Sequence, residues 1–174
     1  MMASDFELPG EGEGAWDERI RLALPRVYRY LFFKVGDRGL AEDLAADTFE
    51  RAWRDRHRYR PERGEWGMWV LGIARHVAAG FLRRHRAVLP IDCADADSED
   101  RPTEEDADRR AEVTRMGKLL CELRDRDRDL VGLKYGAGMT NRAIARLTGL
   151  SETNVGTIIY RAVSRLRRRW EEKP

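Results

Sequence analysis

The sequence predicts an all-α protein built from two small helical domains that are joined by a flexible acidic linker. Apolar side chains recur at intervals of three and four residues, and no stretch keeps the strict alternation of a β-strand. Residues 89–108 carry few large apolar side chains, so they bury too little surface to offset the entropy of ordering. We therefore expect an acidic tail over 1–14, a domain over 15–88, the linker over 89–108 and a second domain over 109–174.

Three apolar stripes predict three helices in the first domain. Their members are Ile20, Leu24, Val27 and Leu31, then Leu40, Leu44, Thr48 and Trp53, and finally Trp66, Val70, Ile73, Val77 and Phe81. Gly36 and Gly39 separate the first two stripes, and Pro61 and Gly64 interrupt the chain before the third.

Two further stripes predict two helices at the start of the second domain. The first stripe consists of Val113, Met116, Leu120 and Leu123, and the second of Leu130, Val131 and Leu133. We expect the second of these helices to end at Gly136 and Gly138, because glycine disfavours helix continuation.

A helix-turn-helix is predicted over residues 139–170. Thr140 can cap a short helix, Gly149 can end it in the left-handed conformation, and Ser151 can cap the next helix. Two helices joined by so short a turn must cross steeply, which is typical of DNA-binding helix-turn-helix units.

The second helix of this unit has the composition of a helix that reads the major groove. Val155, Ile159, Ala162 and Leu166 fall on one face, while Asn154, Thr157, Arg161, Ser164 and Arg168 fall on the other, with Tyr160 and Arg165 beside them. Short polar side chains can pair with base edges, and arginines reach guanine or phosphate. The alternative is a solvated basic face on an ordinary helical hairpin.

The segment from Tyr59 to Arg86 combines aromatic and basic side chains in a way that suits single-stranded DNA. Tyr59, Trp66 and Trp69 are followed by Arg75, Arg83, Arg84 and Arg86, with His76 and His85 between them. Aromatic rings stack on unpaired bases while arginines follow the phosphates. The alternative is that the tryptophans are core residues and the arginines are solvated, and for Trp69 alone a core position is the favoured interpretation.

Charge is distributed unevenly along the chain. The formal net charge is +2 over residues 1–91, −8 over residues 92–108 and +8 over residues 109–174. A basic domain attracts the phosphate backbone by releasing counterions, so the C-terminal block is expected to bind nucleic acid.

Several kinds of protein and site are not expected. No apolar run approaches the roughly 20 residues of a membrane span, and the N-terminus lacks the order of a signal peptide, so we expect a cytoplasmic protein without membrane insertion. Cys93 and Cys121 stand far apart with no CxxC pattern. Since structural zinc normally takes four ligands, we expect thiols and no metal site or cofactor.

Three segments resemble motifs of bacterial sigma factors of the sigma-70 family. Residues 41–53 (AEDLAADTFERAW) look like the polymerase-binding helix, and residues 68–76 (MWVLGIARH) resemble the helix that opens the promoter. Residues 154–162 (NVGTIIYRA) resemble the second DNA-reading helix. Their order, over residues 16–171, and the acidic linker fit the small two-domain extracytoplasmic-function (ECF) sub-class. The resemblance implies that 15–88 is region 2 and 109–174 is region 4.

The resemblance implies a role for each group of residues. The helix that would dock on the clamp of the largest polymerase subunit contains Asp43, Leu44, Asp47, Phe49 and Trp53. The residues implied to contact the melted minus-ten element are Tyr59, Trp66, Trp69, Arg75, His76, Ala79, Arg83 and Arg84, with residues 59–66 forming a loop that captures a flipped base. The residues implied to read duplex DNA at the minus-thirty-five element are Arg142, Asn154, Thr157, Tyr160, Arg161 and Arg165.

The implied partners are core RNA polymerase, through its clamp and the flap of its second subunit, and promoter DNA in both duplex and single-stranded form. An anti-sigma factor is a further partner that the resemblance allows.

The chain departs from the family pattern at several of these positions. His76 stands where the family usually has Asn, Gly80 where it often has Asp, and Ala46 where it often has Gln. Gly156 and Ile158 replace frequent basic residues of the DNA-reading helix. Fewer phosphate contacts weaken duplex binding, so we expect this helix to bind duplex DNA weakly unless polymerase is present.

Two other functions compete with this one. A helix-turn-helix repressor or activator that never joins polymerase explains residues 139–170 equally well, but leaves the segments 40–53 and 59–86 unexplained. An enzyme would need a catalytic group, yet His57, His76 and His85 have no partnered Ser or Cys in a recognisable motif. The sequence therefore predicts no catalytic residues and a specificity subunit without chemistry of its own.

Overall fold

The computed structural model describes the backbone of residues 13–85 and 104–172 and the side chains of 16–85 and 107–172. Within these ranges every regular element is helical, which confirms the all-α prediction. The helices of the first domain are α1 (Glu13–Val35), α2 (Arg38–Arg54) and α3 (Trp66–His85), with short 3₁₀ turns at Arg56–Arg58 and Pro61–Arg63. The second domain contains α4 (Glu104–Cys121), α5 (Asp125–Val131), the π-helical turn η3 (Gly132–Gly136), α6 (Asn141–Thr148) and α7 (Glu152–Glu171).

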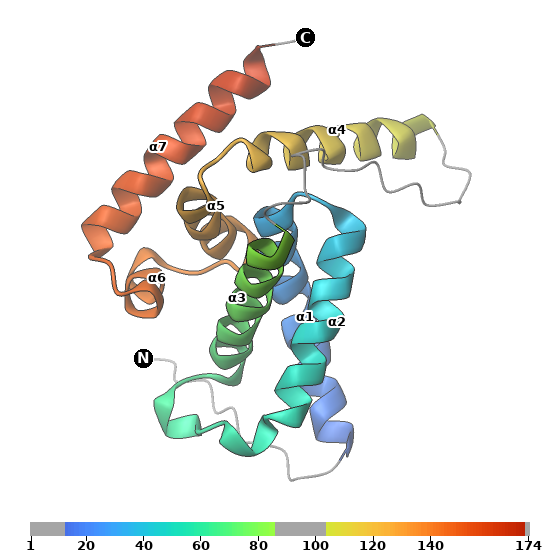
Figure 1. Ribbon diagram of the computed structural model, residues 1–174, viewed down its shortest axis with the longest axis vertical. Coiled ribbons are helices and arrows are strands. Elements are labelled where there is room, and N and C mark those ends of the chain that lie inside the picture. The colour runs from blue at the N-terminus through green and yellow to red at the C-terminus, as the bar shows by residue number, and fades with distance from the viewer. Residues whose placement is uncertain (1–12, 86–103, 173–174) are drawn as a thin grey trace.

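The three helices of the first domain pack against one another, and the joint between α1 and α2 is a tight turn (Figure 1). Gly36 takes a positive φ of 76°, which few other residues adopt easily, and so reverses the chain. Asp37 then caps α2, because its Oδ1 accepts a hydrogen bond of 2.7 Å from the backbone amide of Leu40.

Helix α4 begins earlier than the sequence indicated. Residues 104–108, the end of the predicted linker, already lie in α4, and the rest of the helix packs against α1 and α7. Glu104 and Glu105 open the helix, where negative charge is favoured by the helix dipole. The acidic composition that indicated a linker is therefore also compatible with a helix start. Residues 89–103 of the predicted linker lie outside the described residues, as do residues 1–12 of the predicted tail.

Two members of the predicted apolar stripes are not core residues. Leu24 is 42% exposed and Trp53 is 41% exposed, whereas Val27, Leu31, Leu44 and Thr48 are buried. The period of the helix places Leu24 and Trp53 at the margins of their stripes, where a sequence pattern cannot tell a core position from a surface one.

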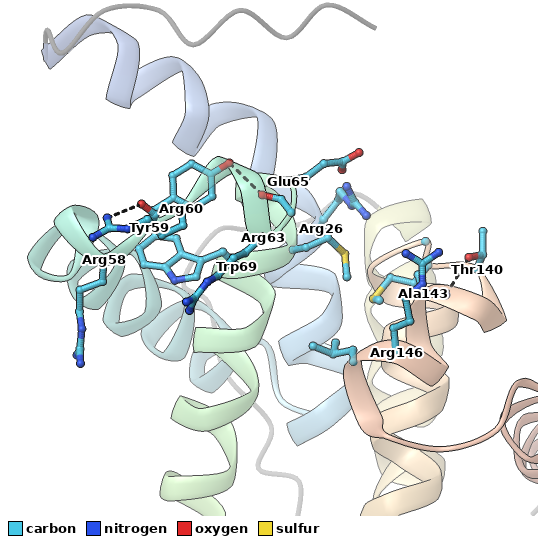
Figure 2. A pocket seen from close by; sticks show the side chains of 15 residues that line it. Arg26, Arg58, Tyr59, Arg60, Arg63, Glu65, Trp69, Thr140, Ala143 and Arg146 are labelled. Carbon is cyan, nitrogen blue, oxygen red and sulfur yellow. Dashed lines mark hydrogen bonds between the residues drawn. The ribbon is translucent and has the colours of Figure 1, made fainter. Parts of the chain in front are cut away.

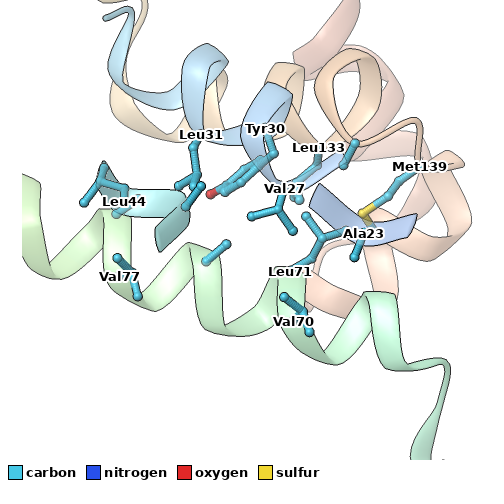
Figure 3. Close-up of a cluster of buried hydrophobic side chains, with 14 of the residues drawn as sticks. Ala23, Val27, Tyr30, Leu31, Leu44, Val70, Leu71, Val77, Leu133 and Met139 are labelled. Carbon is cyan, nitrogen blue, oxygen red and sulfur yellow. The ribbon is translucent and has the colours of Figure 1, made fainter. Parts of the chain in front are cut away.

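The two domains share one apolar core. Figure 3 shows Leu133 and Met139 of the second domain directed into a cluster formed by α1, α2 and α3, beside Val27 and Leu71. All four side chains are less than 5% exposed. A pattern of two domains and a linker does not reveal this contact, because it depends on which apolar faces meet across the joint.

Two glycines let the second domain approach α1 at the distance of backbone contact. A Cβ atom added at Gly136 would lie 2.9 Å from the carbonyl carbon of Arg29, and one added at Gly117 would lie 2.1 Å from the carbonyl oxygen of Gly36. Real side chains do not sit so close to backbone. Both positions therefore require glycine for the domains to pack as they do.

Candidate nucleic-acid interface

The helix-turn-helix forms through the three residues that the sequence indicated. Thr140 Oγ1 accepts a hydrogen bond of 3.2 Å from the amide of Ala143, and Ser151 Oγ accepts one of 3.2 Å from the amide of Asn154. Gly149 ends α6 with a φ of 73°. Both caps and the left-handed turn are thus confirmed.

Helix α7 turns a polar face to solvent and an apolar face to the protein. Val155, Ile159 and Ala162 are buried. The exposed members of the predicted minus-thirty-five set on this helix are Asn154, Thr157, Tyr160, Arg161 and Arg165. Tyr160 is 74% exposed, so its ring is accessible to a partner.

Two members of the predicted duplex-binding set have partners within the chain. Arg142 on α6 lies 3.6 Å from the carboxylate of Glu152, and both side chains are exposed, so this ion pair is weak and easily exchanged for a phosphate. The Thr157 hydroxyl donates a hydrogen bond of 3.0 Å to the Thr153 carbonyl and keeps its lone pairs as acceptors for a base.

The far end of α7 is attached to α4 and to Glu122, the residue that follows it. Arg169 donates hydrogen bonds of 2.9 and 3.0 Å to the two oxygens of Glu122, and Arg115 stacks its guanidinium 4.4 Å from the ring centroid of Trp170. The hydrogen bonds from Arg169 lower the pKa of the Glu122 carboxyl below its ordinary value. The pair helps to fix the direction in which α7 points.

Helix α3 presents a row of exposed side chains that can follow a strand of DNA. His76, Ala79, Arg83 and Arg84 are exposed, and residues 76, 79 and 83 recur at the helical period, so they share one face. The His76 Nδ1 atom lies 2.7 Å from the Gly72 carbonyl oxygen, which leaves Nε2 directed outward. This part of the predicted minus-ten set is accessible to a ligand.

The loop before α3 is held by its aromatic residues. Tyr59 and Trp69 lie with ring centroids 5.5 Å apart, and the Tyr59 hydroxyl donates a hydrogen bond of 3.1 Å to the Gly64 carbonyl. Burial raises the pKa of Tyr59, so its hydroxyl remains a donor at neutral pH. Both rings are half-buried, and Trp69 packs against the core with one part of its surface only.

Trp66 lies inside the core, contrary to its expected place in the DNA-binding set. Its side chain is 7% exposed, and its ring packs edge-on against Trp16 at 5.4 Å and is stacked with Phe49 at 6.5 Å. A ring enclosed on these sides cannot stack on a base without a change in the core. Trp66 instead packs the start of α3 against α1 and α2.

The predicted polymerase-binding residues also divide into buried and exposed side chains. Leu44 is 3% exposed and Phe49 is 8% exposed, so both belong to the core, whereas Asp43, Asp47 and Trp53 are exposed. The Trp53 ring lies 5.0 Å from Trp16 and carries the Arg56 guanidinium 4.1 Å from its centroid. The exposed members of the set are therefore two carboxylates and one aromatic ring near the end of α2.

A cleft of about 710 Å³ separates the loop before α3 from α6, and sequence reasoning missed most of its lining (Figure 2). Its arginines are Arg26, Arg58, Arg60, Arg63 and Arg146, and Glu65 is its one acidic side chain. The alternating arginines of the segment 54–60, RDRHRYR, are the signal that could have indicated a basic loop. The cleft unites this loop with Tyr59 and Trp69 and is suited to an anionic ligand with a planar ring.

Arg75 of the minus-ten set forms an ion pair with the second domain. Its guanidinium forms an ion pair of 2.8 Å with Asp129 on α5 and is half-buried. Despite desolvation, hydrogen bonds and charge attraction from Asp129 raise the pKa of Arg75 further above its ordinary value. No local sequence pattern indicates this pairing, because the two residues lie 54 positions apart.

Comparison with known proteins matches two segments of the chain to known families. Residues 20–88 match the family Sigma-70 region 2, and residues 114–166 match the family Sigma-70, region 4. The chain belongs to the ECF sub-class of the sigma-70 family. Region 2 and region 4 are accordingly the names for its two domains from here on.

Relatives over most of the chain are themselves ECF sigma factors. The ECF RNA polymerase sigma factor BldN of Streptomyces coelicolor is 29% identical over 82% of this chain, which spans only 55% of the length of BldN. The ECF sigma factor RpoE of Cereibacter sphaeroides is 29% identical over 89% of this chain and 86% of its own length. SigM of Bacillus subtilis is 26% identical, with 87% and 92% covered.

Two solved structures share the fold. The sigma factor RpoE of Bartonella quintana, in complex with the anti-sigma factor NepR, has a TM-score of 0.68 at 21% identity and covers 91% of this chain and 98% of its own. CnrH, in complex with the cytosolic domain of CnrY, has a TM-score of 0.66 at 22% identity, with 94% and 92% covered. In the described parts of this chain, no helix has the length and apolar character needed to cross a membrane.

Proposed function

We propose that this chain is the promoter-specificity subunit of an RNA polymerase, which binds the core enzyme, directs it to specific promoters and helps to melt the minus-ten element. One observation carries the proposal: the same chain exposes a DNA-reading face on α7 of region 4 and a basic row on α3 of region 2. A regulator that only binds duplex DNA needs the first surface and has no use for the second.

Region 4 is proposed to bind duplex DNA at the minus-thirty-five element. Thr157 and Arg161 lie one turn apart on the exposed face of α7, with Tyr160 and Arg165 beside them. Arginine pairs with guanine or phosphate, and the threonine hydroxyl with either kind of base edge. Asn154 and Arg142 complete the surface at the start of α7 and on α6.

Region 2 is proposed to bind the melted strand. Arg83 and Arg84 can follow phosphates along α3, and Trp69 and Tyr59 offer half-exposed rings on which a flipped base can stack. The arginine-lined cleft beside these rings supplies positive charge where the backbone of that strand would enter. Unstacking the DNA bases costs about a few kcal/mol of free energy per base step, so stable opening requires the polymerase.

Helix α2 is proposed to dock on the clamp of the largest polymerase subunit through Asp43, Asp47 and Trp53, with Leu44 and Phe49 holding the helix from within. The subunit would act in the cytoplasm, where polymerase and DNA are found, and would carry no catalytic residue of its own. An anti-sigma factor is a fitting regulator, since RpoE of Bartonella quintana, which shares the fold, is bound to one in its solved complex.

Run-off transcription with purified core polymerase on a library of genomic fragments tests this function. We expect transcripts from a small set of promoters only when the chain is added, and the shared sequence of those promoters identifies the two elements. Arg161→Ala should lower promoter use strongly. Arg167→Ala is the matched control, because Arg167 is exposed on the same helix but outside the proposed face.

A helix-turn-helix regulator is the competing function, and a gel-shift experiment separates the two. The isolated chain should bind a promoter duplex much more weakly than the chain together with core polymerase. Equal binding with and without the core enzyme, together with failure to co-purify with it, would establish the regulator instead.

A further inference from the structure

We propose that the arginine-lined cleft between the loop before α3 and α6 binds a free nucleoside triphosphate (Figure 2). The cleft has a volume of about 710 Å³, which falls within the roughly 300–1,000 Å³ that is typical of small-molecule sites. Its lining comes from both region 2 and region 4. A free nucleotide is a different ligand from the melted strand that region 2 is proposed to bind.

The lining of the cleft is strongly basic. Five arginines and one glutamate give it a formal charge of +4. Two of these arginines, Arg63 in the loop before α3 and Arg146 on α6, are exposed, and within the described residues neither side chain has a hydrogen bond or an ion pair. Their guanidinium donors are therefore free to bind a ligand. A guanidinium matches the oxygens of a phosphate with a planar pair of donors.

Arg26 on α1 adds a third guanidinium in a fixed position. Its Nε donates a hydrogen bond of 2.9 Å to the Ala137 carbonyl, and its side chain is half-buried. This hydrogen bond uses one donor of the guanidinium and leaves the donors of the two terminal nitrogens for a ligand. Three guanidinium groups from three separate elements surround one cavity, which suits a chain of phosphates better than a single small anion.

The other two arginines of the cleft are partly engaged within their own loop. Arg58 lies 3.7 Å from the Asp55 carboxylate in an exposed ion pair. Arg60 donates hydrogen bonds of 2.8 and 3.2 Å to the carbonyls of His57 and Tyr59. We therefore assign the main phosphate contacts to the other three arginines.

Aromatic and apolar side chains offer a surface for the base of the nucleotide. Tyr59 and Trp69 line the cleft with ring centroids 5.5 Å apart, and each ring is only half-buried. Met68, Met139 and Leu147 add apolar surface to the same lining. Every base has a π-face that can stack on an aromatic ring. Apolar surface beside arginines thus favours an anion with a planar ring over a simple inorganic anion.

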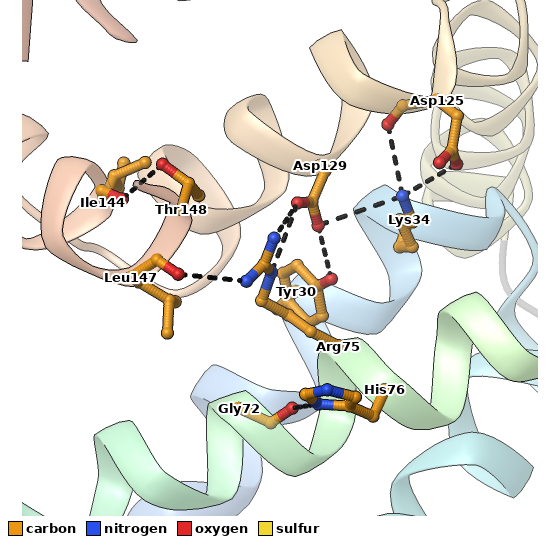
Figure 4. A network of polar contacts seen from close by, with 10 residues as sticks. All are labelled: Tyr30, Lys34, Gly72, Arg75, His76, Asp125, Asp129, Ile144, Leu147 and Thr148. Atoms are coloured by element: carbon orange, nitrogen blue, oxygen red, sulfur yellow. Dashed lines mark hydrogen bonds and ion pairs between the residues drawn. The ribbon is translucent and has the colours of Figure 1, made fainter. Parts of the chain in front are cut away.

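Hydrogen bonds hold both walls of the cleft in place before a ligand binds. On the loop side, the Tyr59 hydroxyl donates a hydrogen bond of 3.1 Å to the Gly64 carbonyl. On the α6 side, Arg75 forms an ion pair of 2.8 Å with Asp129, and its Nη1 donates a hydrogen bond of 3.5 Å to the Leu147 carbonyl (Figure 4). A site that is already ordered loses less conformational entropy when it binds.

Three substitutions in the cleft separate its charges from its rings. Arg63→Ala and Arg146→Ala each remove one guanidinium, from opposite walls, without breaking a hydrogen bond or ion pair of the described side chains. Trp69→Ala removes aromatic surface and leaves the arginines in place. Arg126→Ala is the matched control, because Arg126 is exposed on α5 outside the cleft and its loss changes the charge of region 4 as much as Arg146→Ala does.

Isothermal titration calorimetry of the full-length chain tests the site with ATP, adenosine and inorganic triphosphate as probes. We expect ATP to bind at least about tenfold more tightly than either of the other two, because only ATP uses the rings and the arginines together. Arg63→Ala and Arg146→Ala should each weaken ATP binding by about tenfold, since each removes one charged hydrogen-bond donor. Trp69→Ala should weaken the binding of ATP but not of inorganic triphosphate, and Arg126→Ala should match the wild type.

Thermal unfolding by circular dichroism shows that each variant is folded under the conditions of the titration. Equal affinity of the wild-type chain for ATP and inorganic triphosphate would overturn the nucleotide site, because it would reveal a general attraction of basic surface for anions. Wild-type affinity of Arg146→Ala for ATP would also overturn it, since one wall of the cleft would play no part. Binding of a single-stranded oligonucleotide without binding of ATP would assign the cleft to the melted strand alone. These titrations need neither polymerase nor promoter, so run-off transcription judges the proposed function separately.

Discussion

Replacement of the two tryptophans at the start of α3 should produce opposite defects, because one ring is structural and the other is accessible. Trp66 is 7% exposed and packs against Trp16 and Phe49, so Trp66→Ala removes a buried ring and leaves a cavity. Such a change costs about 3–5 kcal/mol of unfolding free energy. In a chain of this size each kcal/mol lowers the melting temperature by about 2–4 °C, so Tm should fall by about 6–20 °C.

Trp69→Ala removes a half-buried ring that lies beside Tyr59 at 5.5 Å, so it should reduce stability much less. The loss of one stacked base costs about 1–3 kcal/mol of binding free energy, which is about a fivefold to 150-fold loss of promoter opening. Thermal unfolding followed by circular dichroism gives the stability, and potassium permanganate footprinting of the melted strand gives the opening at a temperature where both variants are folded.

A wild-type melting temperature for Trp66→Ala would refute the core role of Trp66, since a core ring cannot be removed without a loss of stability. The assignment is refuted equally if Trp66→Ala is stable but unable to open the promoter while Trp69→Ala is fully active, because the two roles would then be reversed. Trp66→Phe serves as a control that keeps an aromatic ring in the core, and it should recover most of the lost stability.

Three further predictions follow from other parts of the interface. Arg161→Ala should weaken binding of the polymerase holoenzyme to the minus-thirty-five duplex by about 1–3 kcal/mol if Arg161 reads a base, whereas loss of a phosphate contact should reduce the salt dependence of binding by about one counterion. A salt titration of binding distinguishes the two contacts, and a variant with unchanged affinity and unchanged salt dependence would remove Arg161 from the interface. Ser151→Ala removes the cap of α7, whose Oγ accepts a hydrogen bond of 3.2 Å, and should destabilise the start of that helix by about 0.5–2 kcal/mol; hydrogen exchange of residues 152–156 should speed up, and unchanged exchange would contradict the role of the cap. Hydrogen bonds from Arg169 lower the pKa of Glu122, so this pair stabilises the fold above the ordinary glutamate pKa of about 4.3 and ceases to do so as the pH falls through the lowered value; in an NMR titration Arg169→Ala should raise the pKa of Glu122 towards its ordinary value, and an unaltered pKa would show that the pair does not form in solution.

Local features of the fold could be predicted because each depends on neighbouring residues alone. Thr140, Gly149 and Ser151 lie within a few residues of the amides they cap or the turn they make, so the sequence specified the helix-turn-helix. The exposed polar face of α7 likewise follows from the helical period. The prediction of a sigma-type region 2 rested on the motif in residues 68–76, whose row of exposed side chains the structure displays on α3.

Other features could not be predicted, because they depend on residues distant in the chain. The pattern could not separate Trp66 from Trp69, since both follow the same loop and only the packing of Trp16 and Phe49 buries the former. It placed Leu44 and Phe49 among the partner-binding residues, although the same helix must bury one face. The arginine cleft combines Arg26, the loop before α3 and Arg146, which are brought together only by the fold.

By itself, then, the sequence determined the all-α class, the two helices of the helix-turn-helix, their caps and the family, because helical period, capping and motif order are properties of adjacent residues. Only the tertiary structure decided that region 4 closes on region 2. That contact requires Gly117 to meet Gly36 and Asp129 to meet Arg75, Tyr30 and Lys34 across long stretches of chain. Complementary charges and glycines form an interface only where the fold brings two surfaces together, and the sequence pattern does not show which surfaces meet.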